Sequence, residues 1–194
     1  MIKYFRYNHL NCYFVENSKK DIMAFDAGWP CTLFEYKKLL KTIELDYNQI
    51  KWCIVSHIHM DHAGLIGEFQ LSGIDCYMTN EQMSNICEME RIISGNKEYR
   101  NYEAIKKNLL KIMTTGEINT ELNKNGLHGK ILKTTGHSDD SISFLTDAME
   151  ALIGDLSPIE QVMAGDEKSN NSWLLLLEAG ASLIYPSHAD IFRI

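Results

Sequence analysis

The chain has 194 residues, of which 45% are apolar and 23% charged, and its 26 acidic and 19 basic side chains give a formal net charge of −7. This is the composition of a globular protein that can bury a core, and it excludes intrinsic disorder, collagen-like repeats and disulfide-rich scaffolds. A pI near 5.5 with no cluster of Lys and Arg argues against nucleic acid and membranes as partners.

The sequence also carries information about its compartment. The longest apolar run, residues 173–177, is far shorter than the roughly 20 residues that a transmembrane helix needs. Residues 1–14 contain polar interruptions where a secretory signal would be continuously apolar. The five cysteines are odd in number and form no Cys-x-x-Cys pair, which is typical of reduced thiols. We therefore expect a cytoplasmic protein.

Strands and helices alternate along the predicted chain. Apolar runs bounded by polar turns predict strands, and apolar residues at helical spacing predict helices. The predicted strands cover 11–15, 21–26, 51–56, 75–78, 130–133, 141–145, 151–153 and 182–185. The predicted helices cover 32–45, capped by Thr32, then 62–73, 80–114 with a break at 94–96, and 169–178. The order favours an α/β fold of β-sheets packed between helical layers, formed by a single domain over residues 1–194.

Histidine and aspartate side chains gather where predicted strands end. The sequence Ser-His-Ile-His-Met-Asp-His at 56–62 follows the strand 51–56, and Gly-His-Ser, Gly-Asp and Ser-His follow three later strands. His57 and His59 are two residues apart, so in extended backbone they point to the same side. Imidazole nitrogens with a carboxylate suit zinc, and also iron or manganese. The candidate ligands are His57, His59, Asp61, His62, His137, Asp155 and His188.

Any one of these histidines, taken alone, is most simply read as a surface residue. The recurrence of the pattern at successive strand ends argues against that reading for the whole set. Seven ligands are enough for two metal ions that share a water molecule. The sequence therefore predicts a site for two divalent metal ions.

These motifs resemble the metallo-β-lactamase superfamily of metal-dependent hydrolases. The resemblance rests on Asn-Cys-Tyr at 11–13, Phe-Asp-Ala-Gly at 25–28, the block from 56 to 64, and the strand-end motifs that carry His137, Asp155 and His188. It implies an αββα sandwich of two mixed β-sheets flanked by helices, with a dinuclear site at one edge of the sheets. It also implies that His57, His59 and His137 bind the first metal, that Asp61, His62 and His188 bind the second, and that Asp155 bridges both.

The predicted metals, zinc first with iron or manganese as alternatives, imply the chemistry. They would lower the pKa of a bridging water to give hydroxide near pH 7. Asp61 would hold that hydroxide and accept its proton, which makes it the candidate catalytic residue. Asp26 and Ser138 are either structural residues or side chains that orient the ligands.

The sequence narrows the substrate less than the metal site. We expect hydrolysis of a small ester, thioester or lactone; the alternatives are a phosphodiesterase or nuclease, and a non-catalytic metal-binding protein. Asp139 and Asp140 either add negative charge at the mouth of the site or form a polar turn. Segment 80–128 either covers the site or belongs to the core, with Met and Tyr side chains that fit both readings: Met78, Met83, Met89, Tyr99, Tyr102 and Met113. His9 and His128 lie outside the motifs, and the sequence does not decide between a monomer and a homodimer.

Overall fold

Two β-sheets form the centre of the molecule in the computed structural model, which describes residues 2–194. The first sheet has six strands in sequence order: β1 (Ile2–Tyr7), β2 (Leu10–Glu16), β3 (Ile22–Phe25), β4 (Ile50–Ile54), β5 (Asp75–Met78) and β6 (Lys111–Ile112). β1, β2 and β3 pair antiparallel, and β3 to β6 pair parallel, so the sheet is mixed.

The second sheet has five strands in the order β11-β10-β9-β8-β7. Its strands are β7 (Gly129–Lys133), β8 (Ile142–Thr146), β9 (Glu150–Gly154), β10 (Leu183–Pro186) and β11 (Phe192–Arg193). β9 and β10 pair parallel and the other neighbours antiparallel, so this sheet is also mixed.

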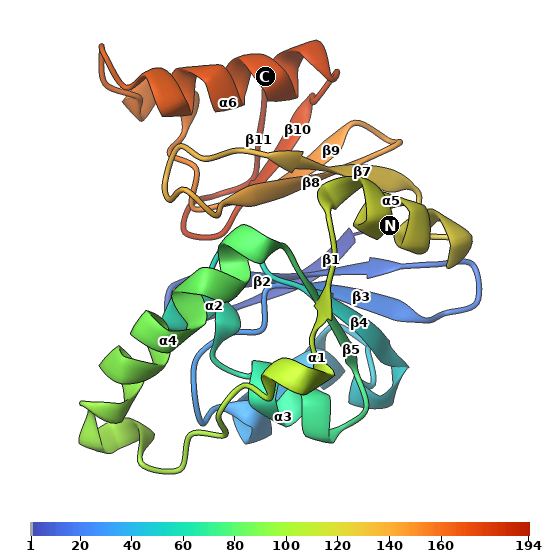
Figure 1. The fold of residues 1–194 in the computed structure, drawn as a ribbon. Helices are drawn as coiled ribbons and strands as arrows, with labels where there is room; N and C mark the ends of the chain where they lie inside the picture. The colour runs from blue at the N-terminus through green and yellow to red at the C-terminus, as the bar shows by residue number, and fades with distance from the viewer. Residues whose placement is uncertain (1) are drawn as a thin grey trace.

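Helices cover the outer faces of both sheets (Figure 1). Below the first sheet lie α1 (Leu33–Thr42), α2 (Met60–Ala63), α3 (Ile66–Leu71) and α4 (Asn80–Ser94); above the second lies α6 (Glu167–Glu178). α5 (Thr115–Lys124) packs beside β7. Four short 3₁₀ turns cover Tyr47–Gln49, Lys97–Tyr99, Lys107–Leu109 and Ile159–Gln161. The predicted αββα sandwich is confirmed.

The alternation of apolar side chains along the strands builds three core layers. In β3, Met23 and Phe25 face the second sheet while Ile22 and Ala24 face α1 and α3, because successive side chains of a strand point to opposite faces. In the second sheet Phe144 points inward, and Ile153 packs with Trp173 of α6. Each sheet is therefore buried on both faces.

One edge of the two sheets is tied together by backbone hydrogen bonds. The amide of Ile142 donates to the carbonyl of Ser56 at 2.8 Å, and the amide of Asn11 donates to the carbonyl of Ser187 at 2.8 Å. Gly154 has φ +58°, and a Cβ there would lie 2.5 Å from Cβ of Ser56. Only glycine allows this approach, so it brings the end of β9 against the end of β4.

Several predicted elements differ from the structure. The predicted helix 62–73 is two short helices, because the amide of Gly64 donates to the carbonyl of Gly28 at 2.9 Å and leaves the helical pattern. In the segment predicted as helical over 80–114, α4 ends at Ser94, at the predicted break, but the helix predicted after the break does not form. Beyond it the chain is held in irregular form by Glu90, which accepts from the amide of Ile105 at 2.8 Å.

Strands β1, β6 and β11 and helix α5 were not predicted. β1 carries charged residues between its apolar ones and joins β2 through Asn8 and His9, both with positive φ. α5 begins at a capping box in which Thr114 and Glu117 bond each other's backbone amides. No helix among residues 2–194 has the length and apolar character needed to cross a membrane.

Candidate metal centre

Seven histidine and aspartate side chains converge at the edge where the two sheets are joined. They form two sets, each with one ligand atom per residue lying within 4.8 Å of the others. The first set consists of His57, His59, His137 and Asp155, and the second of Asp61, His62 and His188. These are the seven residues that the sequence singled out, and the structure brings all of them together.

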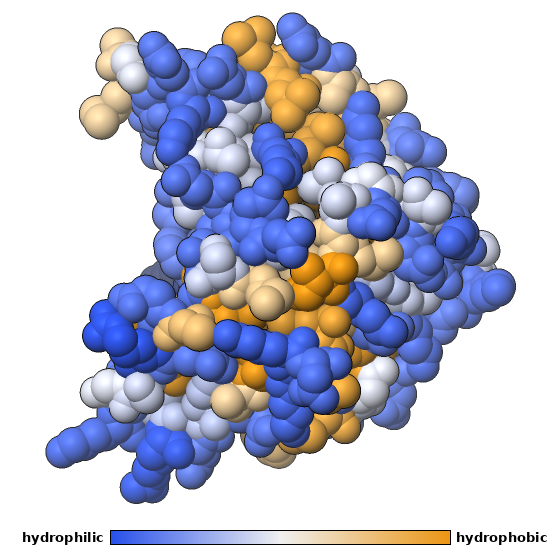
Figure 2. All heavy atoms as spheres, in the orientation of Figure 1, coloured by the Kyte–Doolittle hydropathy of each residue, from blue (hydrophilic) through white to orange (hydrophobic). Residues whose placement is uncertain are grey.

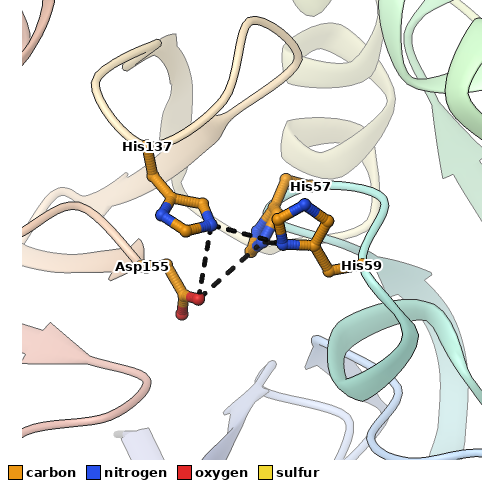
Figure 3. A group of neighbouring side chains, drawn as sticks. All are labelled: His57, His59, His137 and Asp155. Carbon is orange, nitrogen blue, oxygen red and sulfur yellow. Dashed lines mark hydrogen bonds and ion pairs between the residues drawn. The ribbon is translucent and has the colours of Figure 1, made fainter.

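The first set draws on both sheets (Figure 3). His57 and His59 lie on the loop after β4, His137 on the loop between β7 and β8, and Asp155 directly after β9. Nε2 of His57 lies 2.8 Å from Nδ1 of His59, which in turn lies 3.2 Å from Nε2 of His137. Oδ2 of Asp155 is 3.8 Å and 3.6 Å from Nε2 of His57 and His137.

The second set lies beside the first and shares Asp155 with it. Oδ1 of Asp155 is 3.1 Å from Nε2 of His62 and 3.3 Å from Nε2 of His188. Oδ2 of Asp61 is 3.2 Å from Nε2 of His188. One carboxylate thus faces the first set through Oδ2 and the second through Oδ1, which is the geometry a bridging ligand requires.

Buried groups behind the second set fix its orientation. Asp26 is completely buried and its Oδ2 accepts from Nδ1 of His62 at 2.8 Å, so Nε2 of His62 points into the cluster. The same carboxylate accepts from the amide of Ser56 at 2.6 Å and from the hydroxyl of Ser187 at 3.3 Å. Asp26 is therefore the orienting residue that the sequence left open.

Ser138, the other candidate for this role, bonds no site histidine in the structure. Its hydroxyl donates to Oδ1 of Asp140 at 2.8 Å. Asp140 is buried and accepts through Oδ2 from the amide of Ile58 at 2.8 Å, which holds the loop between His57 and His59. Asp139 is exposed and pairs with Lys168. Asp140 is thus a buried support of the ligand loop that the sequence did not identify.

The two remaining histidines differ in their relation to the site. His128 is exposed and lies outside it. The backbone carbonyl of His9 accepts from Nδ1 of His188 at 2.9 Å. This contact could not be found from residue types, because any residue supplies a carbonyl.

The pKa values of the titratable side chains in the cluster depend on their burial and on neighbouring side chains. Burial and the adjacent imidazoles hold the pKa of His57 far below its ordinary value, so its ring is neutral. Burial alone would lower the pKa of His62, but the carboxylates of Asp26 and Asp155 raise it well above its ordinary value. Burial acts most strongly on Asp61 and would raise its pKa, but a hydrogen bond from His188 and the charges of His62 and His188 together lower it.

These residues fit a pair of divalent metal ions. Nε2 of His62 and Oδ1 of Asp155 are buried and have no hydrogen-bond partner of proper geometry among residues 2–194, although such groups normally have one. Three imidazole nitrogens of the first set face one another, as the ligands of a single cation would. Imidazole and carboxylate ligands suit zinc, iron or manganese.

The Met and Tyr residues that the sequence offered as a cover for the site lie in different parts of the structure. Met89 lines a cavity of about 650 Å³ beside His59 and Asp61. Met78 is buried in the core, while Met83 is exposed. Tyr99 and Tyr102 pack on the core below the first sheet, and Met113 packs between the sheets.

Part of the chain matches a family model. The family model described as "Metallo-beta-lactamase superfamily" matches residues 8–79, which include the first four of the seven residues. None of the curated proteins compared with the chain matches it.

Solved structures of the superfamily share the fold. The metallo-beta-lactamase family protein TTHA1429 from Thermus thermophilus aligns with a TM-score of 0.72 at 17% identity, covering 99% of this chain and 74% of that one. TTHA1623 in a di-iron-bound form aligns with a TM-score of 0.70 at 16% identity, covering 100% and 94%. The metallo-beta-lactamase superfamily protein ST1585 from Sulfolobus tokodaii aligns with a TM-score of 0.61 at 14% identity, covering 99% and 81%.

The family match and the fold agree with the motifs of the chain. The fold is that of the solved metallo-beta-lactamase superfamily structures, and the His/Asp cluster lies at its sheet edge. The resemblance to the metallo-β-lactamase superfamily is thus confirmed over residues 8–79 by the family model, and the fold is shared over the whole chain.

Proposed function

We propose that this chain is a dinuclear metal-dependent hydrolase that cleaves a small ester, thioester or lactone. The observation that carries the proposal is the convergence of seven ligand-type side chains into two adjacent sets, with Asp155 facing both. In this proposal the first set holds one divalent metal and the second set holds the other, zinc being the first choice and iron or manganese the alternatives.

Bound metals would supply Lewis acidity, polarising the scissile carbonyl and lowering the pKa of a water molecule. Other residues of the protein orient the side chains that would bind these metals. Asp26 holds His62 with Nε2 directed inward, and the carbonyl of His9 does the same for His188. Such outer contacts select one tautomer and one ring orientation.

Asp61 is the proposed proton acceptor. Burial opposes ionisation of its carboxyl, but the hydrogen bond with His188 and the charges of His62 and His188 together lower its pKa, so it is ionised at neutral pH. An ionised carboxylate beside the reacting atoms can take a proton from the attacking water and return it to the leaving group.

Charge around the cluster favours an uncharged substrate over a phosphodiester. The two cavities that border the seven residues have no Lys or Arg among their described lining side chains. Enzymes that act on phosphate esters commonly add Lys or Arg to their metal ions to clamp the phosphate oxygens. The proposed substrate is therefore a carbonyl compound without a phosphate group.

The test is hydrolysis by protein loaded with zinc, iron or manganese, measured on ester, thioester, lactone and phosphodiester substrates. We expect cleavage of at least one carbonyl class, with the phosphodiester cleaved at least about 10²-fold more slowly. His59→Ala should lower metal content and hydrolysis together, while His128→Ala, an exposed histidine outside the cluster, should change neither. Equal metal content and hydrolysis in His59→Ala and the unchanged protein would overturn the ligand assignment.

A further inference from the structure

The proposed metal centre lies between two cavities of different size and chemistry. The larger, of about 650 Å³, reaches His59 and Asp61. The smaller, of about 310 Å³, reaches His137, Asp155 and His188. Figure 2 shows the outline of the molecule hollowed between the end that carries α6 and the end that carries α4. A molecule that reacts at the cluster therefore has room on both sides of it.

One wall of the larger cavity belongs to α4, which contributes the apolar Met89 and Ile92 beside the polar Asn85 and Glu88. Trp29 and Ile58 extend the apolar part of the lining. α4 is fixed in place, because the buried Gln82 in its first turn donates to the carbonyl of Val55 at 2.8 Å. The volume of the cavity lies within the range of pockets that bury small organic molecules.

Charge in the larger cavity has one sign. Its lining includes the carboxylates of Asp61, Glu88, Asp139 and Asp140 and no Lys or Arg among the described residues. Asp140 accepts hydrogen bonds from the amide of Ile58 and the hydroxyl of Ser138. Glu88 on α4 is paired with Arg91, and Asp139 with Lys168, so these two carboxylates are compensated by cations outside the lining. Because the lining has no Lys or Arg among the described residues, an anionic group at the far end of a bound molecule would lose its hydration without gaining an ionic partner.

The smaller cavity is neutral apart from its ligand residues. Its other lining side chains include Leu156, Ser157, Pro158 and Gln161 from the segment after β9. Gln161 can donate and accept hydrogen bonds, and no side chain there supplies a charge for an ionic partner. This side suits a small, uncharged polar group.

We propose that the substrate spans the metal centre, with a bulky apolar group that carries no negative charge against α4 and a small, neutral polar group against residues 156–161. This inference rests on the proposed hydrolase function for the identity of its site. It narrows the substrate class to esters, thioesters or lactones of an uncharged aliphatic or aromatic compound.

A binding experiment tests this class without depending on turnover. Primary amides mimic the carbonyl centre and resist cleavage, so the metal-loaded protein is titrated with hexanamide, octanamide, suberic acid monoamide and 8-aminooctanamide. Binding is followed by tryptophan fluorescence, with Trp29→Phe to show that the signal comes from the cavity. Metal content is measured on the same samples.

We expect octanamide to bind tighter than hexanamide by about two- to fourfold per added methylene. Suberic acid monoamide should bind at least about tenfold more weakly than octanamide, and 8-aminooctanamide should bind better than the monoamide. Ile92→Lys should improve binding of the monoamide by about threefold to fivefold, since it brings a cation to a lining that has none among the described residues. Met83→Lys is the matched control, because Met83 is exposed on the same helix and does not line the cavity.

Equal binding of octanamide and the monoamide, no dependence on chain length, or no binding of any amide would overturn the inference. Hydrolysis of carbonyl substrates under those results would leave the proposed function standing with a different substrate class. Selective binding of octanamide by protein that takes up no metal and hydrolyses nothing would instead support the cavity assignment and contradict the proposed function.

Discussion

The two ligand sets of the metal centre differ in how firmly the surrounding protein holds them. In the second set, His62 is fully buried and bonded to the buried Asp26, and His188 is bonded to the backbone of residue 9. In the first set, His59 and His137 are exposed, and among residues 2–194 they bond only to other members of the set.

This difference indicates which of the two ligand sets is positioned before a metal ion binds. Outer hydrogen bonds fix the tautomer and orientation of a metal-binding imidazole. Both histidines of the second set are therefore oriented by groups outside it before a metal binds. In the first set only the buried His57 is oriented in this way, by the hydroxyl of Ser56, and the loop from His57 to His59 depends on Asp140. We expect the two metals to bind with different affinities, the second set being the tighter.

The largest expected effect comes from Asp61, the carboxylate of the second set. Asp61→Asn should lower kcat by about 10²- to 10⁴-fold, because an amide cannot accept the proton. Steady-state kinetics with parallel metal analysis would show the loss. Asp147→Asn, which changes an exposed carboxylate on the turn after β8, is the control. Full turnover by an Asp61→Asn protein that still holds two metals would remove the proton-accepting role.

A substitution at Asp26 tests whether the two ligand sets are held independently. Asp26→Asn should weaken metal binding at the second set by about 10- to 100-fold and leave the first set nearly unchanged. Competition titrations with a coloured chelator resolve the two affinities. Asp75→Asn, a half-exposed carboxylate at the start of β5, should alter neither. A uniform loss at both sets would show that Asp26 supports the whole sheet edge rather than His62.

Support of the first set can be measured through Asp140. Asp140→Ala leaves the buried amide of Ile58 without its acceptor, which should lower the free energy of unfolding by about 1–3 kcal/mol. Urea denaturation of the metal-free protein gives this value. The neighbouring Asp139→Ala, at an exposed position paired with Lys168, should cost less than about 1 kcal/mol. Equal costs would mean that Asp140 does not hold the ligand loop.

The smallest expected effect is on stability alone and comes from Glu68, which lies outside the two ligand sets. Burial raises the pKa of Glu68 to about 7, and its Oε2 has no hydrogen-bond partner within residues 2–194. Because the folded pKa exceeds the unfolded one, this carboxyl favours folding at low pH and loses that contribution as pH rises from about 4.5 to about 7.

Glu68→Gln should therefore stabilise the protein at pH 8 by about 1–2 kcal/mol, after allowance for its partial exposure. It should give little change at pH 4.5 and leave both metal affinities unaltered. Urea denaturation at the two pH values checks this. A variant equally stable or less stable at pH 8 would mean that Glu68 is solvated in the folded protein.

Sequence reasoning found the seven cluster residues because all of them follow a predicted strand within a few residues. His57 and His59 lie on the loop after β4, and Asp61 and His62 lie in the short helix α2 next to it. The other three each follow a strand whose apolar run is readable. Their support was harder to predict. Asp26 was left open between two roles, and Asp140 looks like part of a polar turn until the structure shows the amide of Ile58 bonded to it.

The missed elements have a common physical cause. β1 and β6 lie at the edges of the first sheet and gain their order from pairing with β2 and β5. Segment 95–110 is held by contacts with distant residues, such as Gln70 with the backbone of Lys106. Tertiary contacts of this kind leave no periodic pattern in the sequence.

The most direct test of the account is the metal content of protein purified without added metal, measured by elemental mass spectrometry. The account predicts about two divalent metal ions per chain, one for each set. Asp26→Asn should retain about one after dialysis. A protein that carries no metal, and takes up none on titration with zinc, iron or manganese, would contradict the dinuclear centre and the hydrolase proposal with it.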